Sequence, residues 1–300
     1  MRRFVAPHDA VWFLEQFNVC RHGQFAARMA FKRGALAGFQ SVHVFGPGFD
    51  CALDVQNKFL SHASGFRLST MGQLLLVRHG QASFGADDYD QLSDLGKRQS
   101  IRLGAYWQQM AAEQPGAEAL KLEAVLMGSL KRHRQTWEGI AQGAQLQMKP
   151  EVWPELNEYD SHALIETIHP EPLAKPDTPE MYKHHFRLLR TALQQWMAGA
   201  TQPRGMPSYA EFAAGIQAVL KHVRENHQGR VLIVSSGGPI STAVAQILKA
   251  PAETSIELNL RIRNTALTEF VFTPSRHMLL SYNNLPHLDH ADHRSWITFA

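Results

Sequence analysis

One stretch constrains the fold of this 300-residue chain most: the apolar run Leu74-Leu75-Leu76-Val77, followed at once by Arg78-His79-Gly80. An apolar run without polar alternation predicts a strand buried on both faces, as in parallel sheets covered by helices. Open α/β sheets bind ligands at the carboxyl ends of such strands. There, Arg78 supplies a planar fork of donors for phosphate oxygens, and a neutral His79 supplies a nucleophilic nitrogen. Gly80 lets the backbone approach a ligand closely. The stretch therefore predicts an α/β fold with an anion site beside a central strand.

Two further strand-to-helix segments fit the same fold. Val125-Leu126-Met127 predicts a second buried strand, and Arg132 falls in the first turn of the helix that follows it. A helix N-terminus with an arginine is suited to bind an anion. Val231-Leu232-Ile233-Val234 predicts a third strand, and Pro239 marks the first turn of the next helix. The neighbours of Arg132 are interpreted as a basic, solvated helix end (Lys131, His133 and Arg134).

Together these segments resemble the histidine phosphatase superfamily, in its phosphoglycerate mutase-like branch 1. The resemblance spans about residues 72–288 and rests on motifs in the family's order: Arg78-His79-Gly80, the helix start Leu92–Gln99, Leu130-x-Arg132-x-x-x-Thr136, Leu156-Asn157-Glu158, Ser208–Phe212, and Asn264-Thr265 with Leu279–Asn283. It implies a three-layer α/β/α sandwich with a mainly parallel central sheet. It also implies a helical cap insertion, at about 159–207, that sets substrate choice.

The resemblance also implies a mechanism. His79 attacks a phosphomonoester and becomes a phosphohistidine, and Glu158 donates a proton to the leaving oxygen. The expected phosphate-binding residues are Arg78, Arg132, Gly80, Ser236 and Gly237. No metal or cofactor is implied, since the arginines supply the positive charge. The expected partner is a phosphorylated small molecule or a phosphoprotein.

The sequence departs from the family's pattern at Ser236, where relatives carry their second histidine. A serine can donate one hydrogen bond but brings no charge, and a lost charge-assisted bond costs about 1.5–3 kcal/mol. That free energy corresponds to a roughly ten- to hundredfold slower reaction. His287 is the best candidate for a substitute cation. Gly85 is a second departure, because phosphoglycerate mutases carry an asparagine there.

Three functions therefore stay open. The leading prediction is a metal-independent phosphomonoester hydrolase acting through His79. A phosphoglycerate-type mutase would instead need a bisphosphate to prime His79. A third alternative is a catalytically weak phosphate- or phosphoprotein-binding module that keeps Arg78 and Arg132.

Residues 1–70 differ from the rest in composition. They hold ten of the sixteen phenylalanines and carry a net charge of +4, against −1 for residues 71–300. They are interpreted as an atypical leader before a domain over 71–300. Three origins remain open: a reading frame extended upstream of Met71, a disordered or partner-binding arm, and a targeting peptide.

Composition excludes other classes of protein. Two cysteines cannot form a disulfide framework or a four-cysteine zinc site. No apolar run approaches the roughly 20 residues of a membrane span. A net charge of +3 is too weak to indicate nucleic-acid or membrane binding. The expectation is a cytoplasmic protein of undetermined oligomeric state, whose histidine-containing C-terminus (His287, His290 and His293) is a polar tail and not a metal site.

Overall fold

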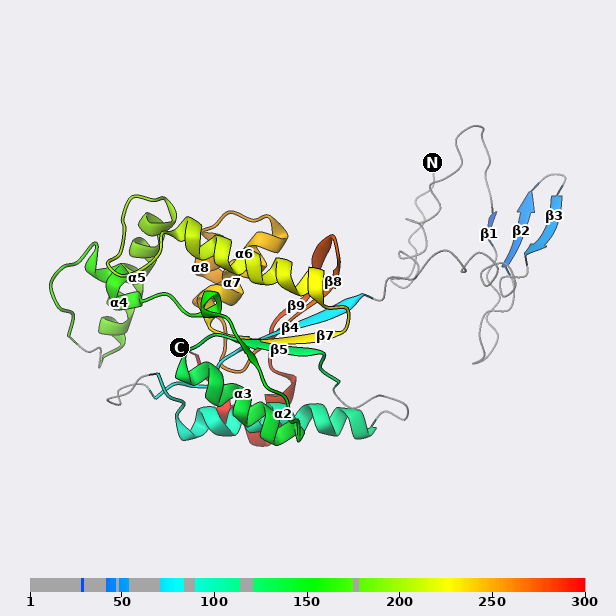
Figure 1. Cartoon of the computed structure of the whole chain (residues 1–300), viewed down its shortest axis with the longest axis horizontal. Coiled ribbons are helices and arrows are strands. Elements are labelled where there is room, and N and C mark those ends of the chain that lie inside the picture. Colours follow the sequence, from blue (N-terminus) through cyan, green and yellow to red (C-terminus); the bar gives the residue numbers. More distant parts are fainter. Residues whose placement is uncertain are drawn as a thin grey trace. The chain divides into compact units, whose positions relative to one another are not determined.

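We describe the protein from a computed structural model of the whole chain (Figure 1). The structure describes residues 71–83, 90–113, 121–174 and 178–299, together with the backbone of three short strands nearer the N-terminus. These are β1 (Arg28–Met29), β2 (Val42–Gly46) and β3 (Phe49–Leu53), which form an antiparallel sheet of their own. The chain divides into two units, Met1–Leu68 and Ser69–Ala300. The rest of the predicted leader and Gly85 lie outside the described residues.

The second unit is built on a six-stranded sheet in the order β6-β5-β7-β4-β8-β9. Its strands are β4 (Gly72–Arg78), β5 (Ala124–Met127), β6 (Glu151–Val152), β7 (Arg230–Ser235), β8 (Leu267–Thr273) and β9 (Arg276–Asn284). The four strands from β6 to β4 are parallel, whereas β8 and β9 add an antiparallel pair at one edge. The predicted mainly parallel sheet is confirmed.

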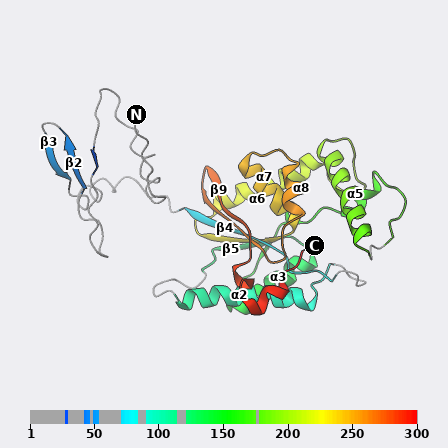
Figure 2. The ribbon, with the colours of Figure 1, turned by 180° about the vertical axis from the view of Figure 1, so that it is seen from behind.

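Helices cover both faces of this sheet, as Figures 1 and 2 show. On one face lie α2 (Asp94–Glu113) and α3 (Lys131–Ala144), and on the other α6 (Tyr209–Asn226) and α7 (Gly237–Leu248), with α8 (Thr254–Asn259) beside α7. Alternate side chains of β4 point to opposite layers. Leu75 and Val77 join the core beneath α2 and α3, whereas Leu74 and Leu76 join the core beneath α6 and α7. The predicted three-layer sandwich is therefore confirmed.

The two helices on the first face touch through glycines. A Cβ atom on Gly143 would collide with the carbonyl oxygen of Ile101, and one on Gly104 would collide with the carbonyl oxygen of Ile140. A Cβ on Gly139 would lie 2.6 Å from the Cβ of Ser100. Backbone therefore packs against backbone along this seam, which fixes the rotation of α3 relative to α2.

Residues 159–207 carry the helices of the predicted cap, α4 (Ser161–Glu166) and α5 (Pro179–Met197). They lie on the side of the second unit where the parallel strands finish (Figure 1). Leu189, Leu193 and Trp196 of α5 are buried in a core of their own with Ile165 of α4. Phe186, near the start of the same helix, is 38% exposed.

The remaining turns are short 3-10 helices: η2 (Pro154–Leu156), η3 (Pro286–Leu288) and η4 (Ala291–Trp296). None of the helices in the described ranges is both long and apolar enough to cross a membrane.

Candidate active site

The parallel pairing of β4 with β7 brings the predicted site residues to one edge of the sheet. Arg78 stands opposite Ser235 in the register, and the backbone N–H of His79 donates to the carbonyl oxygen of Ser235 at 2.9 Å. His79 and Ser236 therefore leave neighbouring strands side by side. This edge is the carboxyl end of the parallel strands, where the sequence predicts a ligand site.

Two arginines are buried at this edge. Arg78 is 4% exposed, and its Nη1 donates to the carbonyl oxygen of Ile262 at 2.5 Å. Arg132 is 8% exposed, and its Nη1 contacts the Asp90 carboxylate at 2.7 Å. Asp90 also accepts the backbone N–H of Lys131 at 2.8 Å, so it fixes Arg132 to the start of α3. Sequence reasoning missed Asp90, which lies in a loop between the predicted motifs.

The hydrogen bonding of His79 defines which of its nitrogens is reactive. Its Nδ1 lies 2.7 Å from the carbonyl oxygen of Gly80. A carbonyl oxygen only accepts, so Nδ1 carries the proton and Nε2 keeps its lone pair in the neutral ring. Burial, followed by the charges of Arg78 and Arg132, holds the pKa of His79 well below its usual value. The ring is therefore neutral and nucleophilic near neutral pH.

Gly80 allows the loop after β4 to pack closely against α2 and α3. Its N–H donates to Thr136 Oγ1 at 3.0 Å, and Thr136 in turn donates to the carbonyl oxygen of Arg132 at 2.7 Å. A Cβ on Gly80 would lie 2.5 Å from the carbonyl oxygen of Gly96 in α2. The close approach expected at Gly80 is thus made by the backbone of α2. Thr136 ties the loop after β4 to the start of α3.

Glu158 lies at the N-terminus of α7. Its Oε2 accepts the N–H of Gly238 at 3.1 Å, and its Oε1 accepts the N–H of Tyr159 at 3.3 Å. Burial raises the pKa of Glu158, and this outweighs the opposing Gly238 hydrogen bond and the charges of Arg132 and Arg78. A carboxyl group with a raised pKa, near two arginines, is suited to donate a proton.

Ser236 and Gly237 open α7. Ser236 is fully buried, and its side chain makes no capping hydrogen bond to the described residues of its own helix. Its Oγ lies instead 2.7 Å from Nε2 of His133. A Cβ on Gly237 would collide with the side-chain oxygen of Asn259, so a larger residue there would displace the Asn259 side chain.

The interpretation of His133 as a solvated helix end is wrong. Its side chain is fully buried, and its ring centroid lies 5.9 Å from that of His79. Arg134 is exposed, as expected. His133 shares a buried face of α3 with Trp137 and Ile140, at the i, i+4, i+7 spacing of an inward stripe. That spacing was the available signal.

His287 lies behind the site. It is fully buried in η3, and its Nε2 lies 2.9 Å from Thr265 Oγ1. Thr265 and Asn264 donate hydrogen bonds to the carbonyl oxygens of Arg78 and His79. Burial and the charge of Arg102 lower the pKa of His287 to about 3. A neutral ring supplies no positive charge, so these contacts do not support His287 as the substitute cation.

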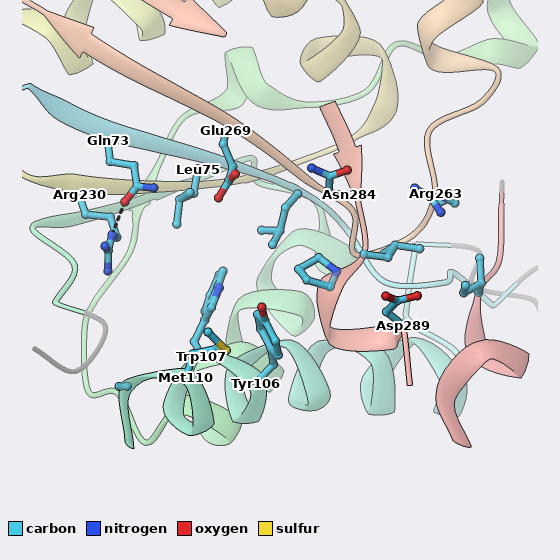
Figure 3. Close-up of a pocket in the computed structure, with 15 residues that line it drawn as sticks. Gln73, Leu75, Tyr106, Trp107, Met110, Arg230, Arg263, Glu269, Asn284 and Asp289 are labelled. Atoms are coloured by element: carbon cyan, nitrogen blue, oxygen red, sulfur yellow. Dashed lines mark hydrogen bonds between the residues drawn. The ribbon is translucent and has the colours of Figure 1, made fainter. Parts of the chain in front are cut away.

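A separate cavity of about 700 Å³ opens between α2 and the sheet (Figure 3). Trp107 and Tyr106 of α2 face Glu269 and Arg230 across it. The described residues that line this cavity include none of the predicted site residues. Among the residues of the described ranges, no group of three histidine, cysteine, aspartate or glutamate side chains is placed to hold a metal ion.

Comparison with known proteins identifies the family of this chain. The family model of the histidine phosphatase superfamily (branch 1) matches residues 74–285. No curated protein sequence matches the chain. Among solved structures the chain is similar to "Mycobacterial hydrolase 1", at 19% identity and a TM-score of 0.50, covering 71% of this chain and 99% of that one.

It is also similar to phosphoglycerate mutase from Bacillus anthracis str. Sterne, at 15% identity and a TM-score of 0.50, covering 73% of this chain and 95% of that one. At these identities the structures show a shared fold, whereas the family model covers the motifs as well. The chain therefore belongs to branch 1 of the histidine phosphatase superfamily, whose enzymes are phosphomonoester hydrolases and mutases.

Proposed function

We propose that this protein hydrolyses phosphomonoesters through a phosphohistidine on His79. The observation that carries the proposal is the hydrogen bond from His79 Nδ1 to the Gly80 carbonyl oxygen, which leaves Nε2 as an unprotonated nucleophile. Buried guanidinium groups of Arg78 and Arg132 act on the same ring. Fixed positive charge in a buried site stabilises a phosphoryl group during its transfer.

The reaction has two balanced steps. In the first, His79 Nε2 forms a bond to phosphorus while the bond from phosphorus to the leaving oxygen breaks. Glu158 gives its proton to that oxygen. In the second, water attacks the phosphohistidine and passes a proton to the Glu158 carboxylate. The phosphorus–nitrogen bond breaks, inorganic phosphate leaves, and both residues regain their starting states.

The test is hydrolysis of p-nitrophenyl phosphate by the full chain without added metal. The reaction is quenched in alkali to look for an acid-labile phosphohistidine. His79→Ala should abolish both turnover and the phosphoprotein. His277→Ala is a matched control, because His277 is a partly buried histidine of β9 outside the site, and it should keep the wild-type rate.

Other outcomes would favour the alternatives. Turnover only after priming with a bisphosphate would indicate a mutase. Vanadate binding without turnover or a phosphohistidine would indicate a binding module.

Since every residue of this mechanism lies after Met71, we also propose that residues 71–300 are sufficient for activity. The same assay on 71–300 tests that, and a loss of rate would assign residues 1–70 a part in the reaction.

A further inference from the structure

The contact between His133 and Ser236 has no part in the mechanism above. Both side chains are fully buried, and His133 Nε2 lies 2.7 Å from Ser236 Oγ. His133 comes from the first turn of α3 and Ser236 from the start of α7, so the contact joins helices on opposite faces of the sheet. It lies beside His79, whose ring is 5.9 Å from that of His133.

We propose that His133 orients the hydroxyl group of Ser236 so that Ser236 donates a hydrogen bond to a phosphoryl oxygen during transfer to His79. This role rests on the proposed function. Ser236 would then be a catalytic residue, and His133 a positioning residue that acts through it.

The proton positions follow from the surroundings of His133. Its Nδ1 lies against Gly128. The Gly128 backbone beside Nδ1 acts to raise the pKa of His133, but no hydrogen bond of normal geometry forms there within the described ranges. We therefore place the proton of the neutral ring on Nε2, where Ser236 Oγ is the partner at 2.7 Å. Nε2–H then donates to Ser236 Oγ. The serine hydroxyl keeps its own hydrogen for another acceptor.

The surroundings of the Ser236 hydroxyl group indicate which acceptor its hydrogen meets. Ser236 does not use its side chain to cap α7 in the described part of the chain, so the hydroxyl group is not committed to its own helix. Arg78 and Arg132 are buried at the same edge, where the N-terminus of a 12-residue helix also favours an anion. An anionic phosphoryl oxygen is the acceptor that matches these charges.

His133 should add no pH dependence of its own to the reaction. Burial and then the charge of Arg132 lower the pKa of His133 to about 3. Arg132 and His79 face it from the active-site edge, and Trp137 and Ile140 share its apolar face. His133 therefore stays neutral and supplies a donor without a charge, so replacing it with a neutral donor should leave the pH profile unchanged.

Four variants of the full chain test the proposal: Ser236→Ala, His133→Leu, His133→Gln, and the double variant with alanine at 236 and leucine at 133. Ser236→Ala and His133→Leu should each lower kcat about ten- to hundredfold with little change in KM, since the bond forms to the reacting group. His133→Gln should stay within about threefold of wild type, because its amide N–H replaces Nε2–H. The double variant should be no slower than either single variant, because the two residues act as a unit.

Matched controls separate this role from packing. Ser241→Ala removes another fully buried hydroxyl group of α7, and His277→Leu removes another histidine that burial keeps neutral. Both should keep the wild-type kcat. Vanadate affinity gives a second readout that needs no turnover, and both Ser236→Ala and His133→Leu should weaken it by a similar factor.

Three results would overturn the inference: wild-type kcat and vanadate affinity in Ser236→Ala, equal losses in His133→Gln and His133→Leu, or losses that multiply in the double variant. The proposed function fails on a different result, namely the absence of a phosphohistidine at His79 in the wild-type chain. In that case vanadate binding still decides whether His133 and Ser236 act together on an anion.

Discussion

At the residue scale, the environment shifts two titratable groups of the site in opposite directions. Burial lowers the pKa of His79 well below its usual value and raises that of Glu158. The proposed mechanism needs His79 unprotonated and Glu158 protonated. Each shift enlarges the pH range in which its group is in the required form. Neither shift could be derived from the sequence, because both depend on how completely the fold covers the side chains.

Glu158→Gln tests, through the pH profile of kcat, whether the reaction needs His79 unprotonated and Glu158 protonated. The wild-type rate should rise as pH passes the pKa of His79 and fall as pH passes the raised pKa of Glu158. The variant should lose only the decrease at higher pH, because glutamine does not titrate. Steady-state rates across pH with one aryl phosphate check this, since the ionisation of the substrate is the same in both proteins. A decrease at higher pH that persists in Glu158→Gln would contradict the assignment.

The same variant should respond to the leaving group. Loss of a general acid costs about 10²- to 10⁴-fold in rate when the leaving oxygen is strongly basic. Glu158→Gln should therefore slow hydrolysis of an alkyl phosphate far more than that of p-nitrophenyl phosphate. Comparing kcat/KM for the two substrates is the measurement. Equal losses would remove Glu158 from the proton transfer.

The sequence predicted the residues whose positions follow from strand ends. Arg78, His79 and Ser236 follow apolar runs, so a parallel sheet necessarily brings them to one edge. His133 and Asp90 could not be placed in the same way. Whether a residue in the first turn of a helix faces solvent or the site depends on the rotation of that helix, which the packing against α2 sets.

At the element scale, the seam between α2 and α3 controls that rotation. Gly143→Ala would place a methyl group onto the carbonyl oxygen of Ile101, and the backbone cannot yield as a flexible side chain does. Overpacking of this kind typically costs about 1–3 kcal/mol. We expect a lower midpoint of urea unfolding, and reduced phosphatase activity because α3 also carries Arg132.

Gly215 of α6 is the matched control. An added Cβ there would meet only the Glu155 side chain, at 3.1 Å, and that side chain is exposed. Gly215→Ala should leave stability unchanged or raise it by up to about 1 kcal/mol, since alanine is the better helix former. Equal destabilisation by the two substitutions would show that the seam has no special role.

Some elements have a recognisable sequence pattern and others do not. β4, β5 and β7 appear as apolar runs because helices cover both of their faces. β6 consists of two exposed residues and has no detectable pattern.

At the scale of the whole molecule, buried neutral histidines should make the fold sensitive to acid. The folded-state pKa of His133 and of His287 is about 3, against 6.5 for an unperturbed histidine. Below pH 6.5 the unfolded chain therefore binds more protons than the folded one, and stability falls as pH decreases. At about pH 5.5 the loss is roughly 1.4 kcal/mol for each of the two residues.

Urea unfolding at about pH 7.5 and about pH 5.5 measures this difference. His287→Leu should reduce the difference by about 1.4 kcal/mol, because the variant removes the contribution of this one histidine. A difference that is the same in the variant and the wild type would show that His287 does not become protonated on unfolding in this range.

The hydrogen bond between His133 and Ser236 has a consequence for how this chain can evolve. It couples two positions that lie 103 residues apart in the sequence. An imidazole introduced at position 236 alone would overlap the ring of His133, and loss of His133 alone would leave Ser236 without its partner. Placing a histidine at position 236 therefore calls for a smaller residue at position 133 as well. Directed-evolution libraries that target this site therefore need to vary the two codons together.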